Sequence, residues 1–332
     1  MKRGYSSEKY LYLFDNTVGQ QLNFEDIRNR DVFRYRVKTI DAGPVRELEI
    51  YPLWNTRNEI RMAKKETREA QQKLNERNAR KKLSRLINTN FTDRDIVVTP
   101  TYNSQYVSLP SEDQALADVR FYLRKVREYR QAHGLDDLKY IYVTEHAEEN
   151  SKKTRIHHHI IMSGMDRNDA ELIWDYVMLS GRFKPQAKKL WKYLLTPHAE
   201  RTGPAPEHPF SGWVNSRRLQ PDEYGFEKLA NYLAKDPKGS KRWGASRNLK
   251  QYTRLSYSDH KISKRKAEQL AMDIDSEGRE LLESMFPDYQ FTASEIRRST
   301  IVAGVYIYLK MHKAKALCRG NPTKKPRSAR DE

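Results

Sequence analysis

Residues 138–164 read LKYIYVTEHAEENSKKTRIHHHIIMSG, two short apolar stretches separated by a polar loop. The stretches at 138–145 and 155–164 are rich in β-branched and aromatic residues, which favours strands. The residues between them, 145–155, are polar enough for the loop of a hairpin. The segment therefore predicts two antiparallel neighbouring strands, and the three consecutive histidines lie in the second of them.

The flanking segments extend this hairpin into an alternation of strands and helices. DIVVTPTY (95–102) indicates a strand, and the helix after it begins with a capping box of Ser111 and Gln114 and ends near Gly134. Beyond the histidine strand, Asp166 caps another helix, SGWVNSRRLQ (211–220) indicates a weaker fourth strand, and a further helix is expected from about Asp222 to Asp236. The order β-α-β-β-α-β-α favours an α+β fold, an RRM-like split βαβ arrangement with a central antiparallel sheet and helices on one face.

The two ends of the chain predict additions to this core. VFRYRVKTI (32–40) and VRELEIYP (45–52) favour a hairpin that turns at Gly43 and Pro44, and residues 59–88 favour a basic helix. The expected divisions are an N-terminal hairpin and basic helix (1–92), a central domain (93–258), a mostly helical C-terminal region with one late strand (259–319) and a disordered basic tail (320–332).

The composition favours an anionic partner. The chain has 332 residues and a formal net charge of +18, for which nucleic acid is the first candidate, although a plain basic surface stays open. Cys318 is the only cysteine, which excludes a disulfide framework and a cysteine-based zinc site. No apolar stretch is long enough for a signal peptide or a membrane span, so we expect a cytoplasmic protein without a membrane partner.

The histidine strand suggests a metal site. Alternate residues of a strand share a face, so His157 and His159 point one way, while Ile156, Ile160 and Met162, with His158 as the polar exception, point to the core. Glu145 ends the neighbouring strand and is the expected third ligand, and His146 is a poorer second choice because of its opposite parity. A solvated polar strand face stays open, and a bulge would instead pair His158 with His159.

A tyrosine on the helix at 222–236 suggests a nucleophile. Phe226, Leu229, Ala230 and Leu233 form its buried stripe, and Tyr232 lies about 110° from the centre of that stripe. Lys228 and Lys235 lie on the side of Tyr232, where their ammonium groups would favour the phenolate and developing phosphate charge. With 20 tyrosines in the chain, a chance placement stays open.

The residue types at and after this site suggest that it binds a divalent cation and a nucleic acid. Imidazole and carboxylate donors near phosphate chemistry point to Mg²⁺ or Mn²⁺, although imidazole would also accept zinc in vitro. After the tyrosine, Lys241, Arg242, Arg247 and Lys250 could hold phosphates and Trp243 could stack on a base, or this loop is simply exposed with Trp243 packed down. His198 and His208, in a Pro-rich loop, are expected to be bystanders.

Three motifs, in this order, resemble the HUH endonuclease superfamily, in particular rolling-circle replication initiators of plasmids, phages and integrative elements. IVVTPTY resembles the first motif, with Pro100 as a departure; HHH at 157–159 resembles the His-hydrophobe-His motif, with His158 in place of the hydrophobe; YLAK at 232–235 resembles the tyrosine motif. The resemblance covers about residues 93–255.

The resemblance implies a function for the central domain. It implies an RRM-like catalytic palm, a divalent metal held by His157 and His159, and a covalent 5′-phosphotyrosyl intermediate on Tyr232, with Lys235 assisting. The partners implied are single-stranded or hairpin origin DNA, with a host helicase and DNA polymerase. A transposase or conjugative relaxase of the same chemistry stays open, as do a non-catalytic RRM-like nucleic-acid-binding protein and a metallohydrolase that uses water directly.

Overall fold

The computed structural model describes most of the chain. The described residues are 14, 32–54, 68–102, 110–145, 156–181, 183–208, 214–234, 243–252, 255–298 and 303–314. They form an α+β structure with two antiparallel five-stranded sheets, which confirms the expected fold class.

The first sheet, called the central sheet below, contains the four predicted strands of the middle of the chain. Its order is β6 (Val214–Arg218), β3 (Ile96–Pro100), β5 (His157–Met162), β4 (Tyr140–Glu145) and β7 (Gly244–Ala245). The predicted hairpin is β4–β5, in which Glu145 pairs with His157 and Val143 pairs with His159. The two-residue β7 was not predicted.

One face of the central sheet is covered by α3 (Glu112–Ala132) and α4 (Arg167–Ser180), whose ends were visible in the sequence. Helix α5 (Lys184–Leu195) packs on α4 and is followed by a 3₁₀ turn (His198–Glu200). Ser111 and Asp166 accept hydrogen bonds from backbone N–H groups in the first turns of α3 and α4, as expected of helix caps. Helix α5 was not predicted, although Ala187, Leu190 and Leu194 occur at helical spacing and are buried.

Helices also cover the second face of the central sheet, so the expectation of helices on one face only was wrong. Leu83 and Ile87 from α2 (Arg68–Asn90) and Ala230 and Leu233 from α6 (Glu227–Leu233) pack on a strip of the sheet that includes Ile161. Helix α6 is also shorter than expected, because residues 222–225 form a turn in which Gly225 has a φ of 65°. Because α6 carries Tyr232, its position on this second face also places the tyrosine there.

The second sheet, called the terminal sheet below, joins strands from both ends of the chain. Its order is β8 (Leu255–Ser258), β1 (Val32–Ala42), β2 (Val45–Trp54), β10 (Val305–Lys313) and β9 (Tyr289–Arg298). The hairpin β1–β2 confirms the predicted turn, in which Gly43 has a φ of 59°. The region 259–319, expected to be mostly helical, contains β9 and β10 besides α7 (Lys264–Met272) and α8 (Glu277–Met285), and the expected tail at 320–332 lies outside the described residues.

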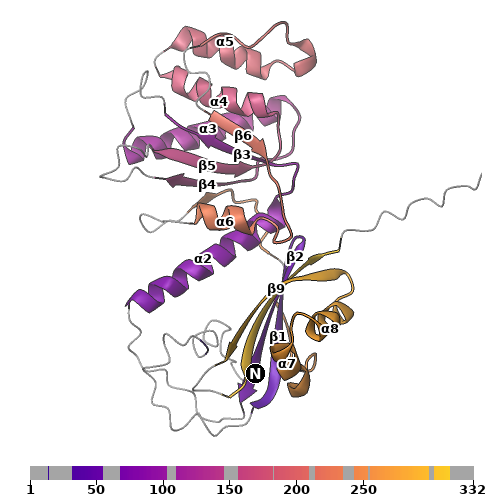
Figure 1. Cartoon of the computed structure of the whole chain (residues 1–332). Coiled ribbons are helices and arrows are strands. Elements are labelled where there is room, and N and C mark those ends of the chain that lie inside the picture. Colours follow the sequence, from indigo (N-terminus) through magenta and orange to yellow (C-terminus); the bar gives the residue numbers. More distant parts are fainter. Residues whose placement is uncertain are drawn as a thin grey trace, which may run out of the picture.

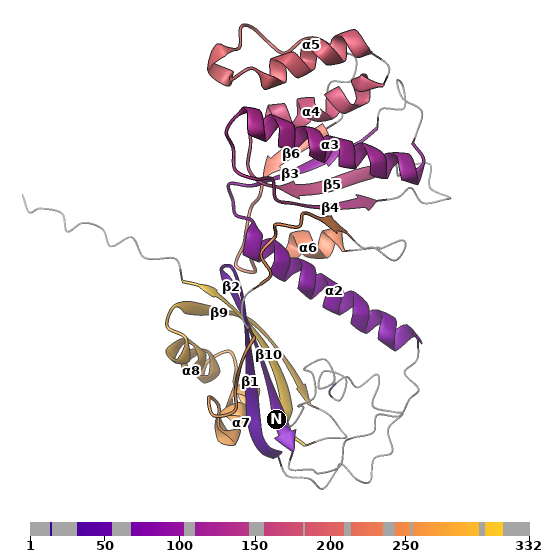
Figure 2. The same ribbon diagram turned by 180° about the vertical axis from the view of Figure 1, so that it is seen from behind.

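The elements form successive layers (Figures 1 and 2). Helices α3, α4 and α5 lie on one side of the central sheet, α2 and α6 lie between the two sheets, and α7 and α8 lie on the far face of the terminal sheet. Within the described ranges, no helix combines the length and the apolar character that crossing a bilayer requires. Helices α2 and α6 both contact the central sheet and form ion pairs with strands of the terminal sheet.

Candidate active site

One face of the central sheet changes from apolar to polar along its strands. Val97, Ile141 and Ile161 lie under α2 and α6. Two residues further along β4 and β5, Val143 and His159 stand opposite each other, and beyond them Glu145 stands opposite His157. Because alternate residues of a strand share a face, the polar end of this face presents both histidines and the glutamate on the side of α6.

Glu145, His157 and His159 form a compact group of metal-ligand type. Glu145 Oε2 lies 3.1 Å from His157 Nε2 and 3.4 Å from His159 Nε2. One donor atom from each residue lies within 4.8 Å of the other two. Two imidazole nitrogens and a carboxylate oxygen that converge from paired strands fit a divalent cation, and the strand parity that selected these residues from the sequence agrees with the geometry.

Tyr232 reaches this group from α6. Its hydroxyl oxygen lies 3.3 Å from His159 Nε2, and the two rings meet edge to face with centroids 5.0 Å apart. The side chain is 51% exposed, although Ala230 and Leu233 on the same helix are buried. A phenol beside the candidate metal ligands and open to solvent has the position that a nucleophile requires.

The surroundings of His159 favour its neutral form. Burial lowers the pKa of His159, and the neighbouring His157 and Arg217 act in the same direction against the opposing effect of Glu145. Thr99 Oγ1 lies 3.3 Å from His159 Nδ1, so the threonine can fix the ring and leave Nε2 facing Tyr232 and Glu145. Neither Thr99 nor Arg217 was predicted to belong to this site. The alternation along 95–102 could have placed Thr99 on this face of the sheet.

His158 has a different role from its two neighbours. It is fully buried on the opposite face, where its Nδ1 lies 2.9 Å from Thr144 Oγ1 and its Nε2 lies 3.2 Å from the Tyr102 hydroxyl. Tyr102 in turn donates a hydrogen bond to Asp118 on α3. Polar partners for both ring nitrogens explain how a histidine replaces the hydrophobe expected at this core position.

A second group of possible donors fits a cation less well. Asp166, Asp169 and His198 also approach within 4.8 Å of one another. However, both Asp169 oxygens accept hydrogen bonds from the Arg201 guanidinium, at 2.7 and 2.6 Å, and Tyr129 donates another. The buried Asp169 carboxylate already has its counter-charge in Arg201, so we interpret this group as an ion-pair network rather than as a cation site.

The expected lysines do not join Tyr232 within the described residues. Lys228 is exposed on α6, and its Nζ lies 2.8 Å from Asp222 Oδ2, which raises the lysine pKa. Lys235, Lys241 and Arg242 lie outside the described residues, as does His146.

The remaining expected DNA contacts lie apart from one another. Trp243 lines a cavity of about 360 Å³ beside α2, together with Tyr252 and Arg85. Arg247 is exposed and lines a different cavity with Arg127 of α3. Lys250 is exposed, and its backbone exchanges hydrogen bonds with the side chain of Asn90 at the end of α2.

Comparison of the chain with models of protein families, with curated proteins and with solved structures found no match in any of the three.

Proposed function

We propose that this protein is a metal-dependent endonuclease and strand transferase of the HUH type, which nicks and rejoins single-stranded DNA through Tyr232. The observation that carries the proposal is the 3.3 Å approach of the Tyr232 hydroxyl to His159, which itself belongs to the group with Glu145 and His157. These four residues come from β4, β5 and α6. The resemblance selects His157, His159 and Tyr232, and the expected pairing of the two strands selects Glu145. We propose that the biological outcome is the initiation of rolling-circle replication of a mobile element.

The chemistry follows from the two kinds of group at the site. When bound by Glu145, His157 and His159, a divalent cation, which we propose to be Mg²⁺ or Mn²⁺, would polarise the scissile phosphate. Tyr232 attacks phosphorus, a bond forms between its phenolic oxygen and phosphorus, and the bond from phosphorus to the 3′-oxygen breaks. The phenol releases its proton to solvent, and the departing oxygen takes up a proton to give a free 3′-OH. Attack by a 3′-OH on the phosphotyrosyl ester reverses the step and rejoins the strand.

The arrangement of the central sheet gives additional support. Counting only the four predicted strands, the spatial order is fourth, first, third, second, all antiparallel. This is the order of a split βαβ sheet of the RRM type. A single nucleophile is also supported, because Tyr224 lies in the turn before α6 and not on the helix.

The main rival from another class has less support. A non-catalytic RRM-like binding protein would use aromatic residues on an open face of its sheet. Here α3 and α4 cover one face of the central sheet, and α2 and α6 pack on part of the other. Neither a transposase nor a relaxase is separated from an initiator by the geometry, since all three would use the same site.

A covalent-adduct assay tests the proposal. The protein, its Tyr232→Phe variant and a matched Tyr224→Phe control are mixed with single-stranded oligonucleotides tiled across the source replicon, with manganese or with a chelator, and resolved on denaturing gels. We expect a metal-dependent protein–DNA adduct that Tyr224→Phe retains and Tyr232→Phe loses. Cleavage without an adduct, unchanged in Tyr232→Phe, would establish a metallohydrolase instead. Binding with neither cleavage nor adduct on any oligonucleotide would leave a binding protein.

A further inference from the structure

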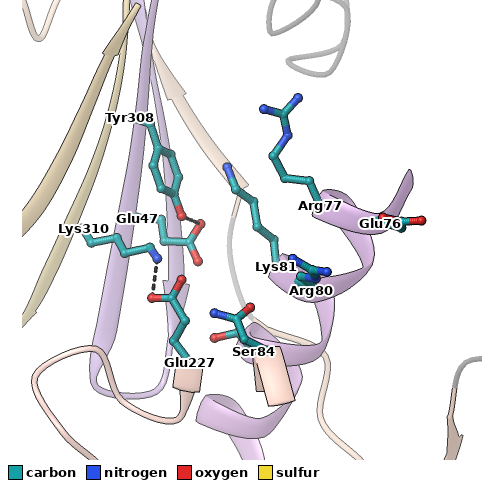
Figure 3. A pocket seen from close by; sticks show the side chains of 10 residues that line it. Glu47, Glu76, Arg77, Arg80, Lys81, Ser84, Glu227, Tyr308 and Lys310 are labelled. Carbon is teal, nitrogen blue, oxygen red and sulfur yellow. Dashed lines mark hydrogen bonds and ion pairs between the residues drawn. The ribbon is translucent and has the colours of Figure 1, made fainter. Parts of the chain in front are cut away.

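A cavity of about 400 Å³ lies between α2, α6 and the face of the terminal sheet that looks toward α2 (Figure 3). Helix α2 contributes Arg77, Arg80 and Lys81 to its wall, α6 contributes Asn231, and β10 contributes Tyr308. The volume lies within the range of small-molecule and nucleotide sites. The cavity is separate from the Glu145–His157–His159 group.

The carboxylates at the cavity already have partners. Glu47 Oε2 lies 2.6 Å from Arg85 Nη2 and accepts a hydrogen bond of 2.7 Å from the Tyr308 hydroxyl. Glu227 pairs with Lys310, as Figure 3 also shows. Glu76 also lines the cavity and accepts a hydrogen bond from Gln72. The basic side chains of α2 therefore give the cavity a positive character.

Lys81 is the clearest sign of an anion site. Within the described residues, no carboxylate lies at ion-pair distance from its ammonium group, which instead lies 3.7 Å from the centroid of the Tyr308 ring. Burial lowers the pKa of Lys81 to about 8, against the opposing effects of Glu47 and Glu49. Arg80 Nε is also buried without a hydrogen-bond acceptor among the described residues. An oxyanion with several acceptor atoms would satisfy both groups.

The neighbourhood of the cavity favours a polymer over a small anion. Lys81 also lines the second cavity beside α2, which is lined by Trp243 and Tyr252. Aromatic rings next to phosphate ligands suit successive bases and phosphates of an unpaired strand. Helix α6 links the cavity to the catalytic group, because Asn231 faces the cavity and the next residue, Tyr232, faces His159.

We propose that the cavity beneath α2 binds the backbone of single-stranded DNA, with Arg77, Arg80 and Lys81 as phosphate ligands and Trp243 and Tyr252 as base-stacking residues on the other side of Lys81. The inference rests on the proposed function for the identity of the polymer. It assigns the strand a path from Tyr232 along α6 to the junction of the two sheets.

The first test compares binding of a single-stranded oligonucleotide in the presence of a chelator, by fluorescence anisotropy across a salt series. Arg80→Gln/Lys81→Gln is matched with Lys264→Gln/Arg265→Gln, which removes the same charge from exposed positions of α7 on the opposite face of the terminal sheet. We expect the cavity variant to bind about tenfold more weakly and its log–log salt slope to decrease by about 1.4, that is by about 0.7 per lost phosphate contact. The control should change less than about twofold. Equal losses in both variants, or none in either, would overturn the proposal.

The second test uses the wild-type chain and does not depend on how the variants fold. With a pKa of about 8, Lys81 is roughly half neutral at that pH and should react with acetic anhydride faster than the exposed Lys264. We expect the oligonucleotide to protect Lys81 but not Lys264, as read by mass spectrometry. Equal protection by inorganic phosphate at the same phosphate concentration would mean that the cavity binds a free anion rather than a DNA strand. Equal protection by an RNA of the same sequence would mean that the cavity does not distinguish DNA from RNA.

The two proposals fail separately. If Lys81 stays unprotected while the Tyr232 adduct forms, the cavity is not part of the DNA path and the catalytic proposal stands. If Lys81 is protected and no adduct forms on any oligonucleotide, the strand binds beneath α2 and the catalytic proposal falls.

Discussion

Asp175 on α4 is a buried carboxyl group outside the candidate active site. Its side chain is 7% exposed, burial raises its pKa to about 8, and the nearby Glu171 carboxylate acts in the same direction. His208 Nε2 lies 3.5 Å from Asp175 Oδ2, and burial lowers the pKa of His208. Both shifts favour uncharged partners, so we regard the contact as a neutral pair near pH 7, although its distance would also allow an ion pair.

This pair predicts how stability depends on pH. The folded chain keeps the Asp175 proton up to about pH 8, whereas the unfolded chain loses it near 3.8, so the folded state binds more protons in between. The free energy of unfolding therefore falls as pH rises through that window. The lowered pKa of His208 makes the free energy of unfolding rise with pH, but this effect ends near the ordinary histidine pKa of 6.5.

We expect Asp175→Asn, which stays neutral, to gain stability relative to wild type between about pH 6.5 and 8, by up to about 2 kcal/mol. Urea denaturation of both proteins at several pH values measures the difference. Parallel stability profiles would show that Asp175 is ionised in the folded chain and paired with a protonated His208.

At the scale of elements, Asn88 near the end of α2 joins two turns. Its side-chain oxygen accepts a hydrogen bond of 2.8 Å from the Phe226 backbone N–H at the start of α6. On its other side the β1–β2 turn approaches so closely that a Cβ on Gly43 would lie 1.9 Å from the Asn88 carbonyl oxygen. The positive φ and the close approach together require glycine at position 43.

Gly43→Ala should therefore destabilise the chain by at least about 2 kcal/mol, from backbone strain and from displacement of the hairpin from α2. Gly134→Ala is a matched control, because Gly134 has a φ of 62° and its added Cβ would meet nothing within 4 Å. The control should lose only the cost of left-handed backbone, about 1 kcal/mol. Equal losses by thermal denaturation would mean that the hairpin does not depend on this contact.

Local patterns predicted four of the five strands of the central sheet, but they did not predict which helices pack on its second face. Strand alternation placed His157 and His159 on one face, and helical spacing placed Tyr232 off the buried stripe of its helix. The layer of α2 and α6 on that face was not predicted, because apolar positions such as Leu83 and Leu233 show that a face is buried but do not name its partner. For the same reason, nothing local to 305–313 indicated that β10 pairs with β2.

At the scale of the whole molecule, ion pairs join the helices that pack on the central sheet to strands of the terminal sheet. Arg85 on α2 pairs with Glu47 on β2, and Tyr308 on β10 donates to the same carboxylate. Burial opposes the charge of Glu47, but Arg85 and Tyr308 keep its pKa below the ordinary value. Lys310 on β10 also pairs with Glu227 on α6. The polar network thus holds α2 and α6 against the terminal sheet.

Arg85→Gln should destabilise the protein by roughly 3 to 5 kcal/mol, because it leaves the Glu47 carboxylate buried without its cation. The double variant Glu47→Gln/Arg85→Gln removes both charges and should recover a large part of that loss. Guanidinium denaturation of the four proteins of this cycle measures the coupling. A double variant no more stable than Arg85→Gln would show that packing, rather than charge, holds the sheets together.

The pairing of β2 with β10 also sets an order on biosynthesis. A nascent chain leaves the ribosome N-terminus first, so every strand of the central sheet has been made before residue 305, where β10 begins. Until then, the β1–β2 hairpin has an open edge on β2, with backbone groups that other chains could pair with. The site at Tyr232 can therefore assemble before β10 is made, whereas the cavity beneath α2 gains Tyr308 only when β10, the last described strand, arrives.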